Sequence, residues 1–218
     1  MAKQRVAVLI SGRGSNMMAL IEAAKELSYP AEIVLVVSNQ PDAAGLALAR
    51  GEGVPTAIVD HRPYGKDRAA FERLLQDTLE EHRVELVCLA GFMRLLTPGF
   101  VLRWHGRMLN IHPSLLPLFP GLDPHGQALQ AGVKISGATV HFVIPEADAG
   151  PIVAQAAVAV CESDSAETLA ERVLAVEHRL YPLALALVAG GRVQMVGNRC
   201  RVDGAHHDVD AALIVPEI

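Results

Sequence analysis

Polar residues with catalytic potential gather in two short segments of the chain. Asn110 and His112 stand two residues apart in NIHPSLLP, and Asp148 stands in PEADAGP. An amide can donate a hydrogen bond to a developing oxyanion, an imidazole can donate or move a proton, and a carboxylate can orient that imidazole. Residues two apart face the same side of an extended chain, so Asn110 and His112 are expected to lie together. On spacing alone, the reading that all three only satisfy loop and turn backbone stays open.

A glycine-rich segment lies between an apolar run and a helical pattern. It consists of Gly12, Arg13, Gly14, Ser15 and Asn16. Free backbone N–H groups at a helix start can hold a phosphate, and glycines would let the phosphate approach them closely. A dinucleotide site would also need a glycine where Met17 stands and an acidic residue where Asn39 stands. We therefore predict a phosphate site, which is compatible with Ser15 or Asn16 capping the helix.

Alternating apolar runs and helical patterns must position these segments. Residues 6–10, 33–37, 57–59 and 86–90 read as buried strands, and residues 17–26, 43–50 and 66–83 read as helices between them. Such alternation predicts a parallel sheet with helices on both faces. Both chemical segments at residues 11–16 and 110–117 follow predicted strands, at the edge where open α/β sheets place their ligands.

The second half of the chain changes character. A fifth strand is predicted at residues 108–111, and the proline-rich stretch 113–124 should hold no regular element. A short helix near 127–131, strands at 138–144 and 152–160, and a long helix at 166–188 follow. Residues 198–218 read as a tail or a late strand. We predict an α/β fold with a Rossmann-like, doubly wound, mostly parallel sheet and an appended antiparallel C-terminal part, forming a single domain over residues 1–218.

Composition narrows the function classes. The net charge is -5 and the pI is about 6.0, without a dense Lys/Arg run, so no nucleic-acid partner is expected. No membrane span or signal peptide is recognisable, so we expect a cytoplasmic protein that acts on small molecules. The spacing of the cysteines predicts neither a disulfide nor a metal site. The sequence leaves open whether the chain is a monomer or a homodimer.

Taken together, the motifs resemble those of the folate-dependent formyltransferases. The likeness includes NIHPSLLP, AGFMR at 90–94, GATVH at 137–141 and DAGP at 148–151, and runs from about residue 6 to residue 193. The resemblance implies that 10-formyltetrahydrofolate donates its formyl group to the amine of glycinamide ribonucleotide in purine biosynthesis. It also implies a catalytic set of Asn110, His112 and Asp148, with a tetrahedral intermediate.

The resemblance implies further contacts. The phosphate segment would bind the nucleotide together with Glu177, and His125 would support the site. The folate would meet Arg68, Met93, Arg94, Leu95, Leu96 and Val143. A cis peptide bond is implied between Leu116 and Pro117.

Two rival functions are weighed beside this one. A formyltetrahydrofolate deformylase would use water in place of the amine, but that branch lacks the Gly14-Ser15-Asn16 loop and carries an N-terminal regulatory domain, for which a first strand at about Arg5 leaves no room. A nucleotide- or folate-binding module without activity would not require an intact set of Asn110, His112 and Asp148.

Overall fold

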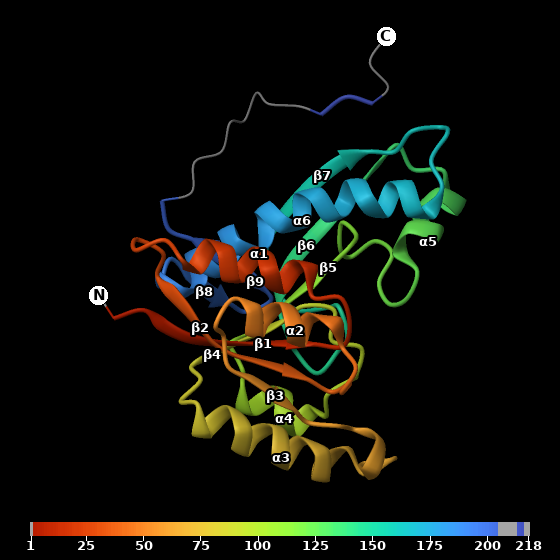
Figure 1. Cartoon of the computed structure of the whole chain (residues 1–218). Coiled ribbons are helices and arrows are strands. Elements are labelled where there is room, and N and C mark those ends of the chain that lie inside the picture. The colour runs from red at the N-terminus through yellow and green to blue at the C-terminus, as the bar shows by residue number, and fades with distance from the viewer. Residues whose placement is uncertain (1, 205–212, 216–218) are drawn as a thin grey trace.

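A seven-stranded sheet organises the chain in the computed structural model, which describes residues 2–204 and 213–215 (Figure 1). Its strands are β1 (Gln4–Ile10), β2 (Ala31–Ser38), β3 (Thr56–Ile58), β4 (Leu86–Leu89), β5 (Met108–His112), β6 (Ile135–Phe142) and β7 (Ile152–Ala159). They lie in the order β3-β2-β1-β4-β5-β6-β7. The first five strands in this order pair in parallel with their neighbours, and β6 pairs antiparallel with both β5 and β7. The predicted fold class is therefore confirmed.

Helices cover both faces of this sheet (Figure 1). They are α1 (Ser15–Ala24), α2 (Ala44–Gly51), the 3-10 helix η1 (Arg62–Tyr64), α3 (Arg68–Glu81), α4 (Pro98–Arg103), α5 (Pro124–Ala131) and α6 (Ala166–Ala189). Alternation along β1 divides the core: Val6 and Val8 pack with α1, α2, α5 and α6, whereas Ala7 and Leu9 pack with α3 and α4. None of the described helices is both long enough and apolar enough to cross a membrane.

Three local features differ from the sequence prediction. Helix α5 begins at Pro124, inside the stretch expected to be irregular, because proline is tolerated in the first turn of a helix. Helix α4 was not predicted. A hairpin of β8 (Val193–Val196) and β9 (Arg199–Val202) follows α6, so the late-strand alternative applies to residues 199–202. The rest of that segment up to residue 212 lies largely outside the described residues.

The carboxyl ends of β1, β4 and β5 meet at one edge of the sheet. The loop after β1 begins at Ser11, the loop after β4 covers residues 90–97 and is called the β4 loop, and β5 ends at His112. Ser11 N–H donates to Gly91 O at 3.1 Å, which brings the first two loops into contact. The fold therefore brings the predicted phosphate segment and the predicted catalytic segment to one edge.

Candidate active site

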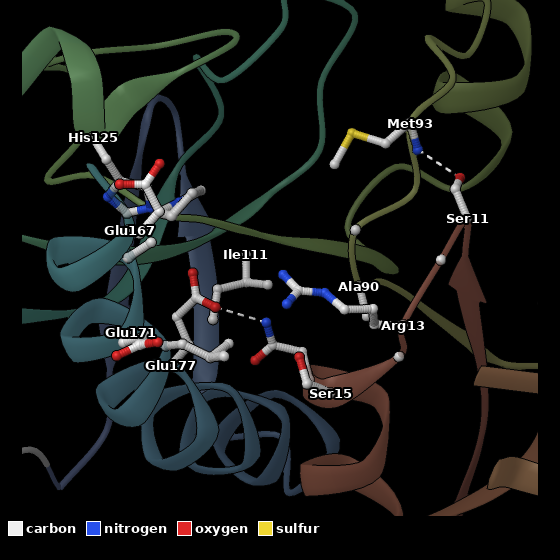
Figure 2. Close-up of a pocket in the computed structure, with 17 residues that line it drawn as sticks. Ser11, Arg13, Ser15, Ala90, Met93, Ile111, His125, Glu167, Glu171 and Glu177 are labelled. Atoms are coloured by element: carbon white, nitrogen blue, oxygen red, sulfur yellow. Dashed lines mark hydrogen bonds between the residues drawn. The ribbon is translucent and has the colours of Figure 1, made fainter. Parts of the chain in front are cut away.

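Two cavities in the described part of the chain are lined by residues of β5, and the larger has a volume of about 680 Å³ (Figure 2). The loop after β1, the start of the β4 loop and the inward face of α6 form its walls. Its lining includes Ser11, Gly12, Arg13, Gly14, Ser15, Asn16, Gly91, Met93, Ile111, His125, Glu167, Glu171 and Glu177. All five residues of the predicted phosphate segment therefore share one cavity with Glu177 and His125.

The backbone of the phosphate segment, residues 12–16, leaves donors free for a ligand. Helix α1 begins at Ser15, so its N-cap residue is Gly14, which has no side chain that could cap the first amides. The expected cap by Ser15 or Asn16 is thus absent, and the first amides of α1 lack intrahelical partners. These donors and the positive end of the helix dipole form a local anion-binding environment.

Gly14 lines the larger cavity and also has a packing role that the sequence did not predict. It has a φ of +78°, and a Cβ built there would lie 2.9 Å from the Cα of Gly45 in α2. Gly45 N–H in turn donates to Gly12 O at 3.0 Å. The missing side chain therefore lets the segment pack against α2, whereas a Cβ on Gly12 would meet no atom within 4 Å.

Asn16 and Glu177 join opposite walls of the larger cavity. Asn16 Nδ2 donates to Glu177 Oε2 at 2.7 Å, while Asn16 Oδ1 is buried without a partner (Figure 2). Burial raises the pKa of Glu177, and the hydrogen bond from Asn16 opposes that rise. Glu177 lines the cavity, and its carboxylate suits hydroxyl donors of a ligand.

Two basic side chains also border this cavity. Arg13 is exposed and extends into it from the phosphate segment, where its charge can meet an anion (Figure 2). His125, at the start of α5, is half-buried and its Nδ1 has no partner. Burial lowers the pKa of His125, which favours the neutral ring.

A second, smaller cavity of about 140 Å³ lies on the other side of β5. Asn110 and Asp148 line it, whereas the next residue of β5, Ile111, lines the larger cavity. Successive residues of a strand face opposite sides, so β5 separates the two spaces. The predicted catalytic residues thus lie where two ligands could meet.

His112 and Asp148 face each other across the smaller cavity's edge. His112 Nδ1 lies 3.6 Å from Asp148 Oδ2, and His112 Nε2 donates to Phe119 O at 3.0 Å. A ring that donates from Nε2 can donate to Asp148 only when it carries a second proton. Asp148 has a positive φ of 53° and its Oδ2 accepts from Gly121 N–H at 2.9 Å, so the proline-rich stretch helps to orient the carboxylate.

His141 completes this cluster, and the sequence analysis did not select it. In the antiparallel ladder it pairs with Asn110, and its Nε2 lies 3.2 Å from Asn110 Nδ2 and 3.9 Å from Asp148 Oδ1. Its Nδ1 donates to Phe142 O at 2.9 Å, so Nε2 accepts from the amide when the ring is neutral. Burial lowers the pKa of His141, against the opposing effects of the Phe142 carbonyl and Asp148. The GATVH segment at 137–141 contains this residue, but only the strand register shows that it lies beside Asn110.

The residues expected to bind folate divide into three groups. Arg94, Leu95, Leu96 and Val143 line the smaller cavity with Asn110. Met93 instead lines the larger cavity and is 73% exposed. Arg68 is exposed at the start of α3 and lines neither of these two cavities.

Two residues of helix α3 contact the β4 loop. Glu72 is buried and accepts from Thr97 N–H at 2.6 Å and from the Thr97 hydroxyl, and the Arg94 guanidinium lies 4.9 Å from the centre of the Phe71 ring.

The Leu116–Pro117 peptide bond is cis, as the resemblance implied. Within the described residues, His, Cys, Asp and Glu side chains form no cluster that could hold a metal ion.

Comparison with known proteins agrees with this geometry. A family model described as formyl transferase matches residues 4–185. The trifunctional purine biosynthetic protein adenosine-3 of Bos taurus is 53% identical over 90% of this chain, which spans only 19% of that protein. The phosphoribosylglycinamide formyltransferase of Escherichia coli (strain K12) is 43% identical, with 91% of this chain and 93% of that protein covered. The protein in a crystal structure of glycinamide ribonucleotide transformylase 1 from Symbiobacterium toebii is 46% identical to this chain, with a TM-score of 0.89. The match covers 92% of this chain and 94% of the chain in that crystal structure.

Proposed function

The chain belongs to the formyl transferase family, and we propose that it transfers the formyl group of 10-formyltetrahydrofolate to the amine of glycinamide ribonucleotide in purine biosynthesis. The observation that carries the proposal is the pair of cavities on either side of β5. Asn110 borders the smaller cavity and Ile111 the larger one, so two ligands can approach the same stretch of strand. Relatives named for this reaction support the choice of substrates.

The larger cavity suits the phosphorylated acceptor. Its phosphate would accept hydrogen bonds from the backbone of residues 12–16 and from Arg13. Its ribose hydroxyls would donate to the Glu177 carboxylate, which Asn16 Nδ2 holds in place. The acceptor amine would then lie near the end of β5.

The smaller cavity suits the pterin end of the folate. Leu96 and Val143 supply apolar contact, and the backbone of the β4 loop supplies polar partners. The remaining predicted folate contacts, Arg68 and Met93, would meet parts of the carrier outside this cavity. Formyltetrahydrofolate enters as a co-substrate, and no step of the chemistry proposed below uses a metal.

Three side chains would perform the transfer. As the amine attacks the formyl carbon, negative charge grows on oxygen, and Asn110 Nδ2 donates to it with the N–H that His141 does not use. A donor of this kind contributes about a hundred- to thousandfold in rate. His112 in its doubly protonated form would donate from Nδ1 to the same oxygen, because Nε2 donates to Phe119 O, and the nearby Asp148 carboxylate would balance the charge of the ring. Asp148 would also accept the proton released by the amine, directly or through water. Collapse of the tetrahedral intermediate then breaks the bond between the formyl carbon and the folate nitrogen, which takes up a proton as tetrahydrofolate leaves.

The deformylase alternative would use water instead of the amine and would not need a phosphate site. The free amides, Arg13 and the Asn16–Glu177 pair argue against it, because together they form a site for a phosphorylated acceptor. A binding module without activity would not require the convergence of Asn110, His112, His141 and Asp148.

Consumption of 10-formyltetrahydrofolate, followed by absorbance with and without glycinamide ribonucleotide, tests the proposal. Strict dependence on the ribonucleotide is expected. Consumption without any acceptor would support the deformylase, and no consumption in either condition would leave a binding module or another acceptor. The variant Arg83→Ala, changed on a distant turn after α3, serves as a matched control and should keep full activity.

A further inference from the structure

Ser11, the first residue of the loop after β1, is hydrogen-bonded twice to the β4 loop, and these two loops border the two cavities. Its N–H donates to Gly91 O at 3.1 Å, and its hydroxyl oxygen accepts from Met93 N–H at 2.8 Å (Figure 2). The phosphate segment begins at the next residue of the chain. Beyond Met93, the β4 loop lines the smaller cavity with Arg94 and Leu95. A change in the position of Ser11 would therefore move both the phosphate segment in the larger cavity and the β4 loop in the smaller cavity.

Asn39 sets the direction of the Ser11 hydroxyl. The residue follows β2, is 2% exposed, and lines neither of the two cavities. Ser11 Oγ donates its single proton to Asn39 Oδ1 at 2.6 Å, which leaves the hydroxyl lone pairs for the Met93 N–H. His61 also holds Asn39, because His61 Nδ1 lies 3.1 Å from Asn39 Nδ2 and 2.9 Å from the backbone oxygen of Asn39, and in either tautomer it forms one of these two hydrogen bonds.

This arrangement gives the two ligands a shared ordering step. The β4 loop is weakly packed at its tip, where Met93 and Leu95 are 73% and 63% exposed. A phosphate that fixes residues 12–16 also fixes Ser11, and through its two hydrogen bonds it restrains the tip of the β4 loop. A ligand that binds second then loses less conformational freedom, which is positive coupling between the sites.

We propose that Asn39 is a positioning residue which, through the Ser11 hydroxyl, couples the binding of the phosphorylated acceptor to the binding of folate. The inference rests on the proposed function, because it takes the two cavities as the sites of those two ligands. A residue that only supports the fold would affect stability and would leave the two affinities independent of each other. The coupling factor separates these roles. It is the ratio of the Kd of the acceptor measured without folate to the Kd measured with saturating folate.

Titration calorimetry with two ligands that do not react together measures this factor. The Kd of glycinamide ribonucleotide is determined with and without saturating tetrahydrofolate, which lacks the formyl group. In the wild-type protein the folate should tighten ribonucleotide binding by about fivefold or more, the lower end of typical coupling. In Asn39→Ala the ratio should fall to about one, because the Ser11 hydroxyl is no longer directed towards Met93.

Matched variants make the result specific. Asn39→Asp keeps an acceptor for the Ser11 proton and should retain most of the ratio, whereas Ser11→Ala removes the bridging hydroxyl and should abolish it. Gln40→Ala alters the neighbouring side chain outside this network and should leave the ratio unchanged. If Asn39→Ala does not fold, Ser11→Ala decides the question.

Each outcome is informative. A wild-type ratio of one with both ligands bound overturns the coupling and leaves the proposed function intact. A wild-type ratio that persists in Asn39→Ala or in Ser11→Ala overturns the role of this network. A wild-type protein that binds neither ligand removes the proposed function, and the coupling with it.

Discussion

Replacing Gly14 with alanine should destabilise the fold, whereas the same change at Gly12 should not. At Gly14 the φ of +78° lies in the left-handed region, which costs a residue with a Cβ about 1–2 kcal/mol. The new Cβ would also lie 2.9 Å from the Cα of Gly45, and two backbone segments cannot separate without moving α2. Such overpacking costs about 1–3 kcal/mol, so Gly14→Ala should lose about 2–5 kcal/mol of the free energy of unfolding.

Gly12→Ala is the matched comparison within the same loop. The new Cβ would meet no atom within 4 Å and the φ of Gly12 is not in the left-handed region. The free energy of unfolding should therefore fall by no more than about 0.5 kcal/mol. Gly12 lines the larger cavity, so this variant should instead raise the Kd of glycinamide ribonucleotide. The two variants thus test two different effects, helix packing at Gly14 and ligand approach at Gly12.

Thermal and urea unfolding, followed by circular dichroism, measure the difference. A loss of 1 kcal/mol lowers the Tm of a chain of this size by about 2–4 °C, so Gly14→Ala should melt at least about 4 °C below the wild type. Equal Tm values for the two variants would refute the steric argument. Equal folate affinity in both variants is expected, and serves as the control for a general effect on the site.

Three further predictions follow from the site and the core. Asp148→Asn should keep the fold, since asparagine also tolerates the positive φ, yet lower kcat by about a hundredfold to ten-thousandfold, and a near-normal kcat with normal circular dichroism would contradict the assigned role. Because burial lowers the pKa of His141, the unfolded chain binds its proton more tightly, so the free energy of unfolding should fall as the pH drops below about 6.5. His141→Gln should flatten that dependence in urea titrations at pH 5.5 and 7.5, and an unchanged slope would exclude His141 as its source. Cys161 is exposed and burial raises the pKa of Cys88 to about 12, so a thiol reagent at pH 8 should label Cys161 in the native protein and Cys88 only after unfolding, with fast native labelling of Cys88 as the contrary result.

Local patterns account for the parts of the fold that were predicted correctly. The inner strands β1, β4 and β5 appeared as short apolar runs, because they are largely buried on both faces. The edge strand β3 is only partly buried, and Ile58 is 50% exposed. Helix α4 and the β8–β9 hairpin were missed, because a six-residue helix and two four-residue strands are too short to show a period. The start of α5 at Pro124 was missed because proline signals both a loop and a first helical turn.

The sequence by itself determined the residue types and the loops that are proposed to carry the chemistry, including residues 12–16, Asn110, His112 and Asp148. Only the tertiary structure decided which side chains meet. Asn16 and Glu177 pair across 161 residues, and the register of β5 against β6 places His141 beside Asn110. It also left Arg68 outside both cavities and turned Gly14 towards α2. The physical reason is that periodicity and turn chemistry are local, whereas strand register and helix packing are set by contacts between distant segments, which no single stretch of sequence encodes.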